Sequence, residues 1–284
     1  MGKMGKDTSR GVAHGAFSGI GLADTAMARI FLALLSFLLA APATAEDAAL
    51  ADPFVRRGIE GTMVISSLRG GERRIHNDSR ANRRFSPAST FKMLNTLIAL
   101  EERAIAGKDD VLPWNGHRYA IPDWNRDQTL KSAFRVSCVW CFQELAARIG
   151  ARKYRDYLRR TGYGTLHQPF EEKTFWLDGA LQISAAEQVE FLDKVYRRAL
   201  PFSPSSYQTL REIMVVEQTP TVTIRAKTGW ATQANPQVGW YVGYVETQND
   251  VWFFASNIVV RDEKDLPLRR ELTREALQTA GIME

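Results

Sequence analysis

A serine and a lysine three positions apart, Ser89 and Lys92, have the types and spacing that covalent chemistry needs. On a helix, side chains at this spacing lie on one face. A serine hydroxyl becomes a strong nucleophile when a base takes its proton, and a lysine can be that base if its amine is neutral or modified. The first turn of a helix also offers unpaired N–H groups that stabilise an oxyanion. The pair predicts acyl transfer through a serine ester, although so short a motif also occurs by chance at helix starts.

Two further motifs follow in an informative order. Ser137-Cys138-Val139 lies in a region with helical patterning, and Lys227-Thr228-Gly229 lies in a β-rich run near the C-terminus. The order S-x-x-K, then S-x-N or S-x-V, then K-T-G is typical of the serine enzymes that recognise penicillin. Each motif is weak by itself, but their order, spacing and local context agree.

The sequence pattern predicts the secondary structure on both sides of the first motif. Residues 59–77 contain two short strand-like runs around Gly70-Gly71, which predict a hairpin. The residues after Ser89 have the apolar spacing of a buried helix, with Pro87 just before it and Gly107 just past its end. Further helical segments are predicted at 143–149, 154–161 and 185–199.

The last part of the chain changes to strand patterning. Strands are predicted over 221–226, 237–246 and 251–260, followed by an amphipathic helix over 269–280. The order of strands, helices, strands and helix predicts an α/β fold, with an antiparallel sheet flanked by helices and an inserted all-helical lobe. We expect the sheet lobe to comprise about 46–92 and 203–284, and the helical lobe about 93–202. The cleft between lobes is the natural place for chemistry.

The N-terminal 45 residues have the layout of a secretory signal peptide. Residues 30–41 are an apolar run that follows Arg29 and precedes the small residues Ala43-Thr44-Ala45. This run is too short for a typical membrane-spanning helix, although a retained anchor is the alternative. Met27 directly precedes the charged start of the run and is a possible true start. We therefore expect a mature domain of 46–284 that works in the periplasm, without a membrane once the signal is removed.

Cys138 and Cys141 are the two cysteines. In an exported protein a C-x-x-C pair can be a disulfide, a redox motif or half a zinc site. It can equally be two small buried side chains that pack as apolar groups. We expect the pair to be structural, and we leave the bond open.

Metal ions and nucleic acids are not expected partners. The histidines are scattered and form no metal-ligand motif; they are His14, His76, His117 and His167. The formal net charge is +5, but basic and acidic residues alternate along the mature part, as on a solvated surface.

From about Gly61 to Ile282 the chain resembles the class D serine β-lactamases, the oxacillinases. The first motif has that family's Ser-Thr-Phe-Lys form, and Val139 stands where penicillin-binding proteins and class A enzymes usually carry Asn. Matching segments also occur around Trp124, at residues 175–179 and at residues 266–269. One departure is Thr165, which stands in place of an Asn after Tyr163-Gly164.

The resemblance implies the serine β-lactamase/transpeptidase fold and the hydrolysis of β-lactam antibiotics through an acyl-enzyme. Ser89 would attack the lactam carbonyl, and Lys92 would be carboxylated by CO2 on its ε-nitrogen and act as the general base. Trp176 would donate a hydrogen bond to that carbamate. An apolar pocket suits this modification, because burial lowers a lysine pKa and only the neutral amine reacts with CO2.

The remaining roles follow from the same resemblance. Ser137 would relay a proton to the leaving nitrogen, beside Lys227. The N–H groups of Ser89 and Trp230 would form the oxyanion hole, and Thr228 and Arg269 would bind the substrate carboxylate. The implied substrate-binding residues are Trp124, Val139, Leu177, Thr228, Gly229, Trp230 and Arg269. The partner would be a small β-lactam, and no cofactor is expected beyond CO2.

Two other classes of protein share these motifs. A membrane-tethered β-lactam sensor acylates and stalls, and a cell-wall peptidase acts on D-Ala-D-Ala. The short chain, Val139 and the lack of a long apolar segment after residue 45 favour the hydrolase. The loop 231–236 is expected to help shape the choice of substrate, but the sequence does not predict which β-lactams are hydrolysed.

Overall fold

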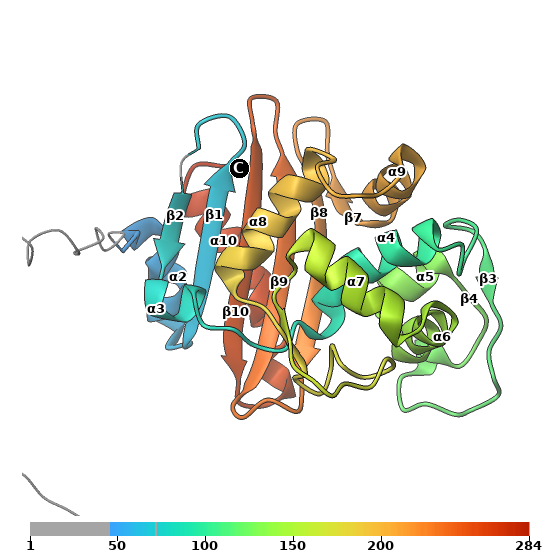
Figure 1. Cartoon of the computed structure of the whole chain (residues 1–284). Coiled ribbons are helices and arrows are strands. Elements are labelled where there is room, and N and C mark those ends of the chain that lie inside the picture. The colour runs from blue at the N-terminus through green and yellow to red at the C-terminus, as the bar shows by residue number, and fades with distance from the viewer. Residues whose placement is uncertain (1–45, 72, 284) are drawn as a thin grey trace, which may run out of the picture. The chain divides into compact units, whose positions relative to one another are not determined.

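The structure is a computed structural model that describes residues 46–71 and 73–283. The predicted signal peptide and the possible start at Met27 lie outside these residues. A six-stranded antiparallel sheet has the strand order β2-β1-β10-β9-β8-β7 (Figure 1). Its strands are β1 (Gly61–Ser67), β2 (Arg73–His76), β7 (Val215–Gln218), β8 (Thr223–Ala231), β9 (Gln237–Glu246) and β10 (Val251–Val260).

Both faces of the sheet are covered, and the strand sequences reflect this. In β1, Met63 and Ile65 contribute to one apolar core while Val64 contributes to the other. Successive side chains of a strand point to opposite faces, so each central strand supplies two cores. This is why β9 and β10 read as nearly continuous apolar runs rather than as alternating ones.

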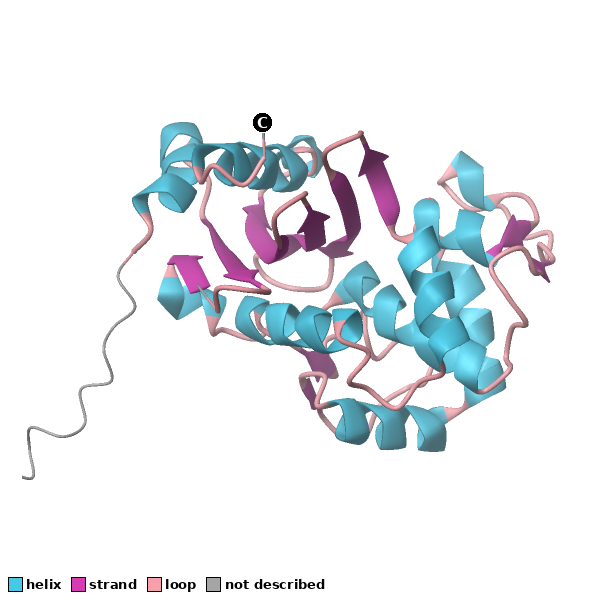
Figure 2. Ribbon diagram, turned by 90° about the horizontal axis from the view of Figure 1, so that it is seen from above, coloured by secondary structure: helices cyan, strands magenta, loops and turns pink. Residues whose placement is uncertain are grey.

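Helices lie against each face (Figure 2). On one face α10 (Leu268–Thr279) packs against β9, β10 and α2 (Ala48–Arg57). On the other face α8 (Ala185–Tyr196) packs against β1, β9 and β10. No helix among the described residues has the length and apolar character that crossing a membrane requires.

The helical lobe lies beside β7 and β8 (Figure 1). Its helices are α4 (Lys92–Glu101), α5 (Leu130–Arg135), α6 (Val139–Ile149), α7 (Ala151–Thr161) and α9 (Pro204–Ile213). The short elements are α3 (Asp78–Ala81), η1 (Ala88–Phe91), η2 (Pro122–Trp124), η3 (Glu263–Asp265), β3 (Val111–Leu112), β4 (Gln128–Thr129), β5 (Thr165–Leu166) and β6 (Leu181–Gln182).

The predicted fold class is confirmed, and the hairpin, β9 and β10 lie where the sequence placed them. Two helices lie on the other side of the expected lobe boundary. Helix α8 falls within 93–202 but covers the sheet, because its apolar side is needed to bury that face. Helix α9 falls within 203–284 but contacts α4 and α5 of the helical lobe.

Candidate active site

The serine and lysine of the first motif meet at the junction of η1 and α4. The side-chain nitrogen of Lys92, Nζ, lies 2.8 Å from Ser89 Oγ, which is within hydrogen-bond distance. Ser89 is partly exposed, whereas the Lys92 side chain is fully buried. The predicted pairing on one helix face is therefore present, with the hydroxyl accessible and the amine enclosed.

Burial sets the charge of Lys92. Desolvation lowers the pKa of the Lys92 amine to about 7, and no carboxylate acts against this shift. The nearest aromatic face belongs to Phe142, whose ring centroid lies 5.1 Å from Nζ. Phe142 was not among the predicted site residues, although it stands one helical turn after Val139 on α6. A large share of Lys92 is consequently neutral near pH 7.

Trp176 presents a buried donor without an acceptor. Its side chain is fully buried, and its indole N–H has no hydrogen-bond partner among the described residues. The ring stacks on Phe91 at 5.6 Å, and the Trp176 carbonyl accepts a hydrogen bond from Ser86 Oγ at 2.8 Å. A buried N–H without an acceptor is unfavourable by about 1–3 kcal/mol. The site therefore has an unused donor held in a fixed position.

Ala88 and Ser137, in or next to the first two motifs, have a left-handed backbone. Ala88, directly before Ser89, has φ of 46°, and Ser137 has φ of 59°. For residues with a side chain, this conformation costs about 1–3 kcal/mol, and such residues gather at functional sites. Backbone strain is therefore present beside Ser89 and at Ser137, as is common at functional sites.

The second and third motifs meet across the two lobes. The buried Lys227 on β8 donates from Nζ to Ser137 Oγ at 2.9 Å and to the Thr228 carbonyl at 2.9 Å. Burial, reinforced by the positive charges of Lys92, Arg269 and Arg270, holds the pKa of Lys227 well below its usual value. This arrangement can pass a proton through the Ser137 hydroxyl.

Gly229 allows β8 to approach the segment that carries Ser89. A Cβ atom at this position would lie 2.9 Å from the Pro87 carbonyl oxygen and 3.2 Å from Thr90 Cγ2. Because Gly229 has no side chain, strand β8 can pack directly against η1. The close approach requires glycine and brings Thr228 and the partly buried Trp230 alongside Ser89.

Arg269 reaches β8 from α10. Its Nη1 donates to the Gly229 carbonyl at 2.7 Å, and its buried Nε has no partner among the described residues. Burial lowers the pKa of Arg269 to about 10. The guanidinium remains positive at neutral pH and has no carboxylate partner in the described part of the chain.

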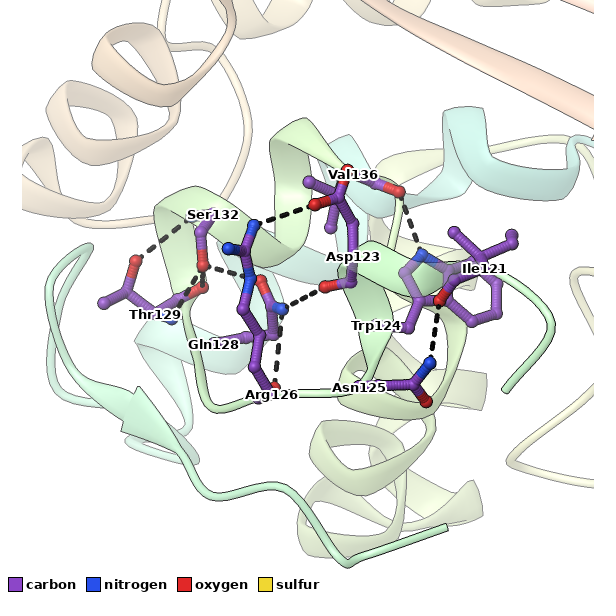
Figure 3. Close-up of polar contacts among 9 residues, drawn as sticks. All are labelled: Ile121, Asp123, Trp124, Asn125, Arg126, Gln128, Thr129, Ser132 and Val136. Atoms are coloured by element: carbon purple, nitrogen blue, oxygen red, sulfur yellow. Dashed lines mark hydrogen bonds and ion pairs between the residues drawn. The ribbon is translucent and has the colours of Figure 1, made fainter. Parts of the chain in front are cut away.

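A hydrogen-bonded loop holds Trp124 beside the second motif (Figure 3). The Trp124 indole N–H donates to the Val136 carbonyl at 3.1 Å, one residue before Ser137. Gln128 braces the same turn by donating from Nε2 to the Asp123 carbonyl at 2.7 Å and accepting from Ser132 Oγ at 2.7 Å. The loop thus fixes an aromatic side chain at the rim of the site.

Other predicted residues lie around this centre. Val139 begins α6, and Trp230 donates from its indole N–H to Gln237 Oε1 at 2.9 Å. Leu177 lines a separate hollow of about 440 Å³ beside Gly179 and Ser86. Leu177 follows Trp176 in the chain and packs, partly buried, against the larger apolar core.

Cys138 and Cys141 form a disulfide, with Cα atoms 5.5 Å apart. Both are fully buried, and Cys138 Sγ accepts from the Cys141 N–H at the start of α6. This resolves the alternatives left open by the sequence in favour of a bonded pair. The bond closes the first turn of the helix that follows Ser137.

Residues 163–165, where the sequence departs from the family pattern at Thr165, are closely packed. Gly164 has φ of 62°, and a Cβ there would lie 2.2 Å from the Gln182 carbonyl. Tyr163 is buried, and its hydroxyl bonds Gln188 Oε1 at 3.3 Å. Thr165 follows in β5, which pairs with β6. Tyr163 and Gly164 position this segment against α8, whatever stands at 165.

Within residues 46–71 and 73–283, no group of three or more His, Cys, Asp or Glu side chains is placed to hold a metal ion.

Comparison with known proteins gives a consistent result. The family model described as "Penicillin binding protein transpeptidase domain" matches residues 61–278. The chain is 34% identical to β-lactamase OXA-10 of Pseudomonas aeruginosa, over 91% of this chain and 98% of that protein. It is 37% identical to β-lactamase OXA-48 of Klebsiella pneumoniae, over 81% of this chain and 87% of that protein. Among solved structures, the class D β-lactamase YbXI from Nostoc is 39% identical, covers 82% of this chain and 99% of its own, and has a TM-score of 0.81.

Proposed function

The chain belongs to the class D β-lactamases, and on that premise we propose that it hydrolyses β-lactam antibiotics through an acyl-enzyme on Ser89, with a carboxylated Lys92 as general base. The observation that carries the proposal is the buried Lys92 amine, which lies 2.8 Å from the Ser89 hydroxyl with no carboxylate to keep it charged. Because only a neutral amine reacts with CO2, the low pKa of the buried Lys92 amine favours this modification.

In acylation, Ser89 Oγ forms a bond to the lactam carbonyl carbon while the base takes the hydroxyl proton. The tetrahedral oxyanion is stabilised by the backbone N–H groups of Ser89 and Trp230. The lactam C–N bond then breaks, and Ser137 delivers a proton to the leaving nitrogen. The 2.9 Å contact with Lys227 supports this role, because it supplies the relay with a second donor.

Carboxylation of Lys92 is the finer part of the proposal. The neutral amine adds to CO2 and releases one proton, and the resulting carbamate would be the base for acylation and for activating water in deacylation. Two features of the site fit this group. The amine is neutral to a large extent at pH 7, and the Trp176 N–H has no acceptor of its own. Phe142 and Phe91 keep the surroundings apolar.

Substrate binding is proposed to depend on the rim of the same site. Thr228 and Arg269 would hold the carboxylate of the β-lactam, since Arg269 is cationic and free of any carboxylate partner in the described residues. Trp124, Val139 and Leu177 would provide apolar contact. Gly229 would act by letting β8 lie close to Ser89.

We also propose that the protein works in the periplasm. The disulfide Cys138–Cys141 supports this, because such bonds persist in oxidising compartments. The partner would be a small β-lactam molecule, with CO2 as the source of the lysine modification and no further cofactor.

Mixing the protein with a chromogenic cephalosporin tests the proposal directly. Continuous turnover that disappears in Ser89→Ala would support hydrolysis. A single burst equal to the enzyme concentration would indicate a sensor that acylates and stalls. Slow inhibition of D-Ala-D-Ala cleavage, without turnover of the cephalosporin, would indicate a peptidase.

A further inference from the structure

A second hollow adjoins the K-T-G motif. It has a volume of about 570 Å³ and lies where α5, the junction of α9 and β7, β8 and α10 meet. Lys227 and Thr228 form part of its wall. It therefore adjoins Thr228, one of the two residues proposed to hold the substrate carboxylate, although none of the roles assigned above uses the hollow itself.

The hollow is rich in positive charge. Lys131 and Arg135 enter it from α5, and Arg270 enters it from α10. All three side chains are exposed, and within the described residues none of them has a carboxylate partner or a side-chain hydrogen bond. Arg270 instead lies 5.9 Å from the centre of the Tyr241 ring.

Glu212, the acidic residue that lines the hollow, does not form an ion pair with any of these three side chains among the described residues. Its carboxylate instead accepts a hydrogen bond from Gln208 at 2.9 Å and lies 3.6 Å from Lys108. The charge reaches the motif itself, since Arg270 is among the positive groups that lower the pKa of Lys227. An excess of like charge in a recess attracts anions.

The strand edge beside the hollow is open. Strand β7 pairs with β8 as far as Arg225, and the Ala226 N–H bonds the Met214 carbonyl. From Lys227 onward no neighbouring strand covers that edge of β8 within the described residues. A ligand lying along this edge can reach both Thr228 and the hollow.

The chemistry of cephalosporins decides which part of a ligand would lie there. Their carboxylate and their variable C3 substituent are carried by adjacent ring carbons, whereas the acylamino side chain is at the far end of the molecule. If Thr228 and Arg269 hold the carboxylate, the C3 substituent is the part that extends into the neighbouring hollow.

We propose that this hollow is a subsite for a second anionic group, carried by the ring substituent next to the carboxylate, so that the enzyme favours dianionic β-lactams of this type. The inference rests on the proposed function and makes its substrate class more specific. Lys131, Arg135 and Arg270 are the specificity-determining residues, and they take no part in the bond-breaking steps.

A matched pair of substrates isolates the effect. Cefonicid and cefamandole share the same acylamino side chain and differ in the tetrazole of the C3 substituent, which carries a sulfomethyl group or a neutral methyl group. We would measure kcat/KM for both with the wild type and with Lys131→Gln/Arg135→Gln/Arg270→Gln. The control variant, Arg152→Gln/Lys173→Gln/Lys264→Gln, removes the same charge from other exposed positions.

The ratio of kcat/KM for cefonicid to that for cefamandole should fall about tenfold in the subsite variant, given that exposed ion pairs contribute modestly. It should be unchanged in the control variant, and the wild-type ratio should shrink in high salt. Equal ratios in all three proteins would overturn the subsite. An equal fall in the ratio of kcat/KM for carbenicillin to that for benzylpenicillin would also overturn it, because the extra carboxylate of carbenicillin is on the acylamino side. Hydrolysis of benzylpenicillin but of neither cephalosporin would also overturn the subsite, whereas failure of the wild type to hydrolyse any of these β-lactams would contradict the proposed function.

Discussion

Lys227 of β8 donates a hydrogen bond to Ser137, which lies two residues before the start of α6, and so joins the sheet to the helical lobe through two side chains. The contact is 2.9 Å long and involves a fully enclosed amine. The proposed proton relay depends on this one bond between elements that are 90 residues apart.

Ser137→Ala should lower kcat/KM for β-lactams by about 10²–10⁴-fold, because the leaving nitrogen loses its positioned donor. Thermal stability should change little, since Ser137 is only partly buried. Stopped-flow acylation rates would measure the effect, with the exposed Ser205→Ala as the control. Unchanged acylation in Ser137→Ala would remove this residue from the mechanism.

Activity should depend on pH and on CO2. The Lys92 pKa is about 7, so the neutral amine that CO2 needs becomes scarcer as the pH falls below 7. Acid also protonates the carbamate, which then loses CO2. In CO2-depleted buffer, turnover should therefore fall as the pH is lowered through about 7, and added bicarbonate should restore it. Indifference to bicarbonate at low pH would mean that Lys92 acts unmodified.

Trp176→Phe sharpens that measurement. The variant keeps a ring to stack on Phe91 but removes the indole N–H, so the carbamate loses a donor. The bicarbonate concentration that restores half of the activity should rise by about ten- to a hundredfold, as expected from the loss of a hydrogen bond to a charged group that contributes about 1.5–3 kcal/mol. Trp252→Phe on β10 serves as the control and should leave the requirement unchanged.

Arg269→Ala should raise KM far more than it lowers kcat. A charge-assisted hydrogen bond contributes about 1.5–3 kcal/mol, and ground-state binding of the substrate carboxylate would bear most of this loss. Because Arg269 also donates to the Gly229 carbonyl, circular dichroism and the melting temperature should accompany the kinetics. A fall confined to kcat would assign Arg269 to chemistry or to the placement of β8 instead.

The double variant Cys138→Ala/Cys141→Ala should retain hydrolysis and lose only modest stability. A disulfide across so short a loop gains less than the roughly 3 kcal/mol of a 15-residue loop. Thiol labelling of the denatured wild type should find no free cysteine before reduction and two afterwards. Loss of turnover in a well-folded double variant would show that the bond also positions Ser137.

Local pattern and motif order predicted much of this fold and site. The helix after Ser89, strands β9 and β10 and the side-by-side placement of Ser89 and Lys92 all follow from periodicity, which depends on nearby residues alone. The grouping of the three motifs followed from their resemblance to a family. Periodicity and motif order can both be taken directly from the amino-acid sequence.

What the sequence could not predict depends on tertiary packing. The apolar pattern of α8 predicts a helix, but it does not predict the surface against which the helix packs. Helix α8 packs on the sheet because that apolar sheet face would otherwise be exposed to water. The oxidation state of Cys138 depends on its backbone conformation, and the unpaired N–H of Trp176 depends on every neighbour that might have accepted it. Phe142 gains its place beside Lys92 only when α6 packs on α4.

The most direct test of the account is the mass of the acyl-enzyme. Wild-type protein mixed with benzylpenicillin in bicarbonate-containing buffer near neutral pH, then quenched in acid during turnover, should carry one covalent penicillin. After trypsin digestion the added mass should lie in the peptide 85–92 and fragment to Ser89. A Ser89→Ala variant with an unchanged melting temperature should carry none. An adduct on another residue, or an equal adduct on Ser89→Ala, would contradict the central claim that Ser89 is the nucleophile.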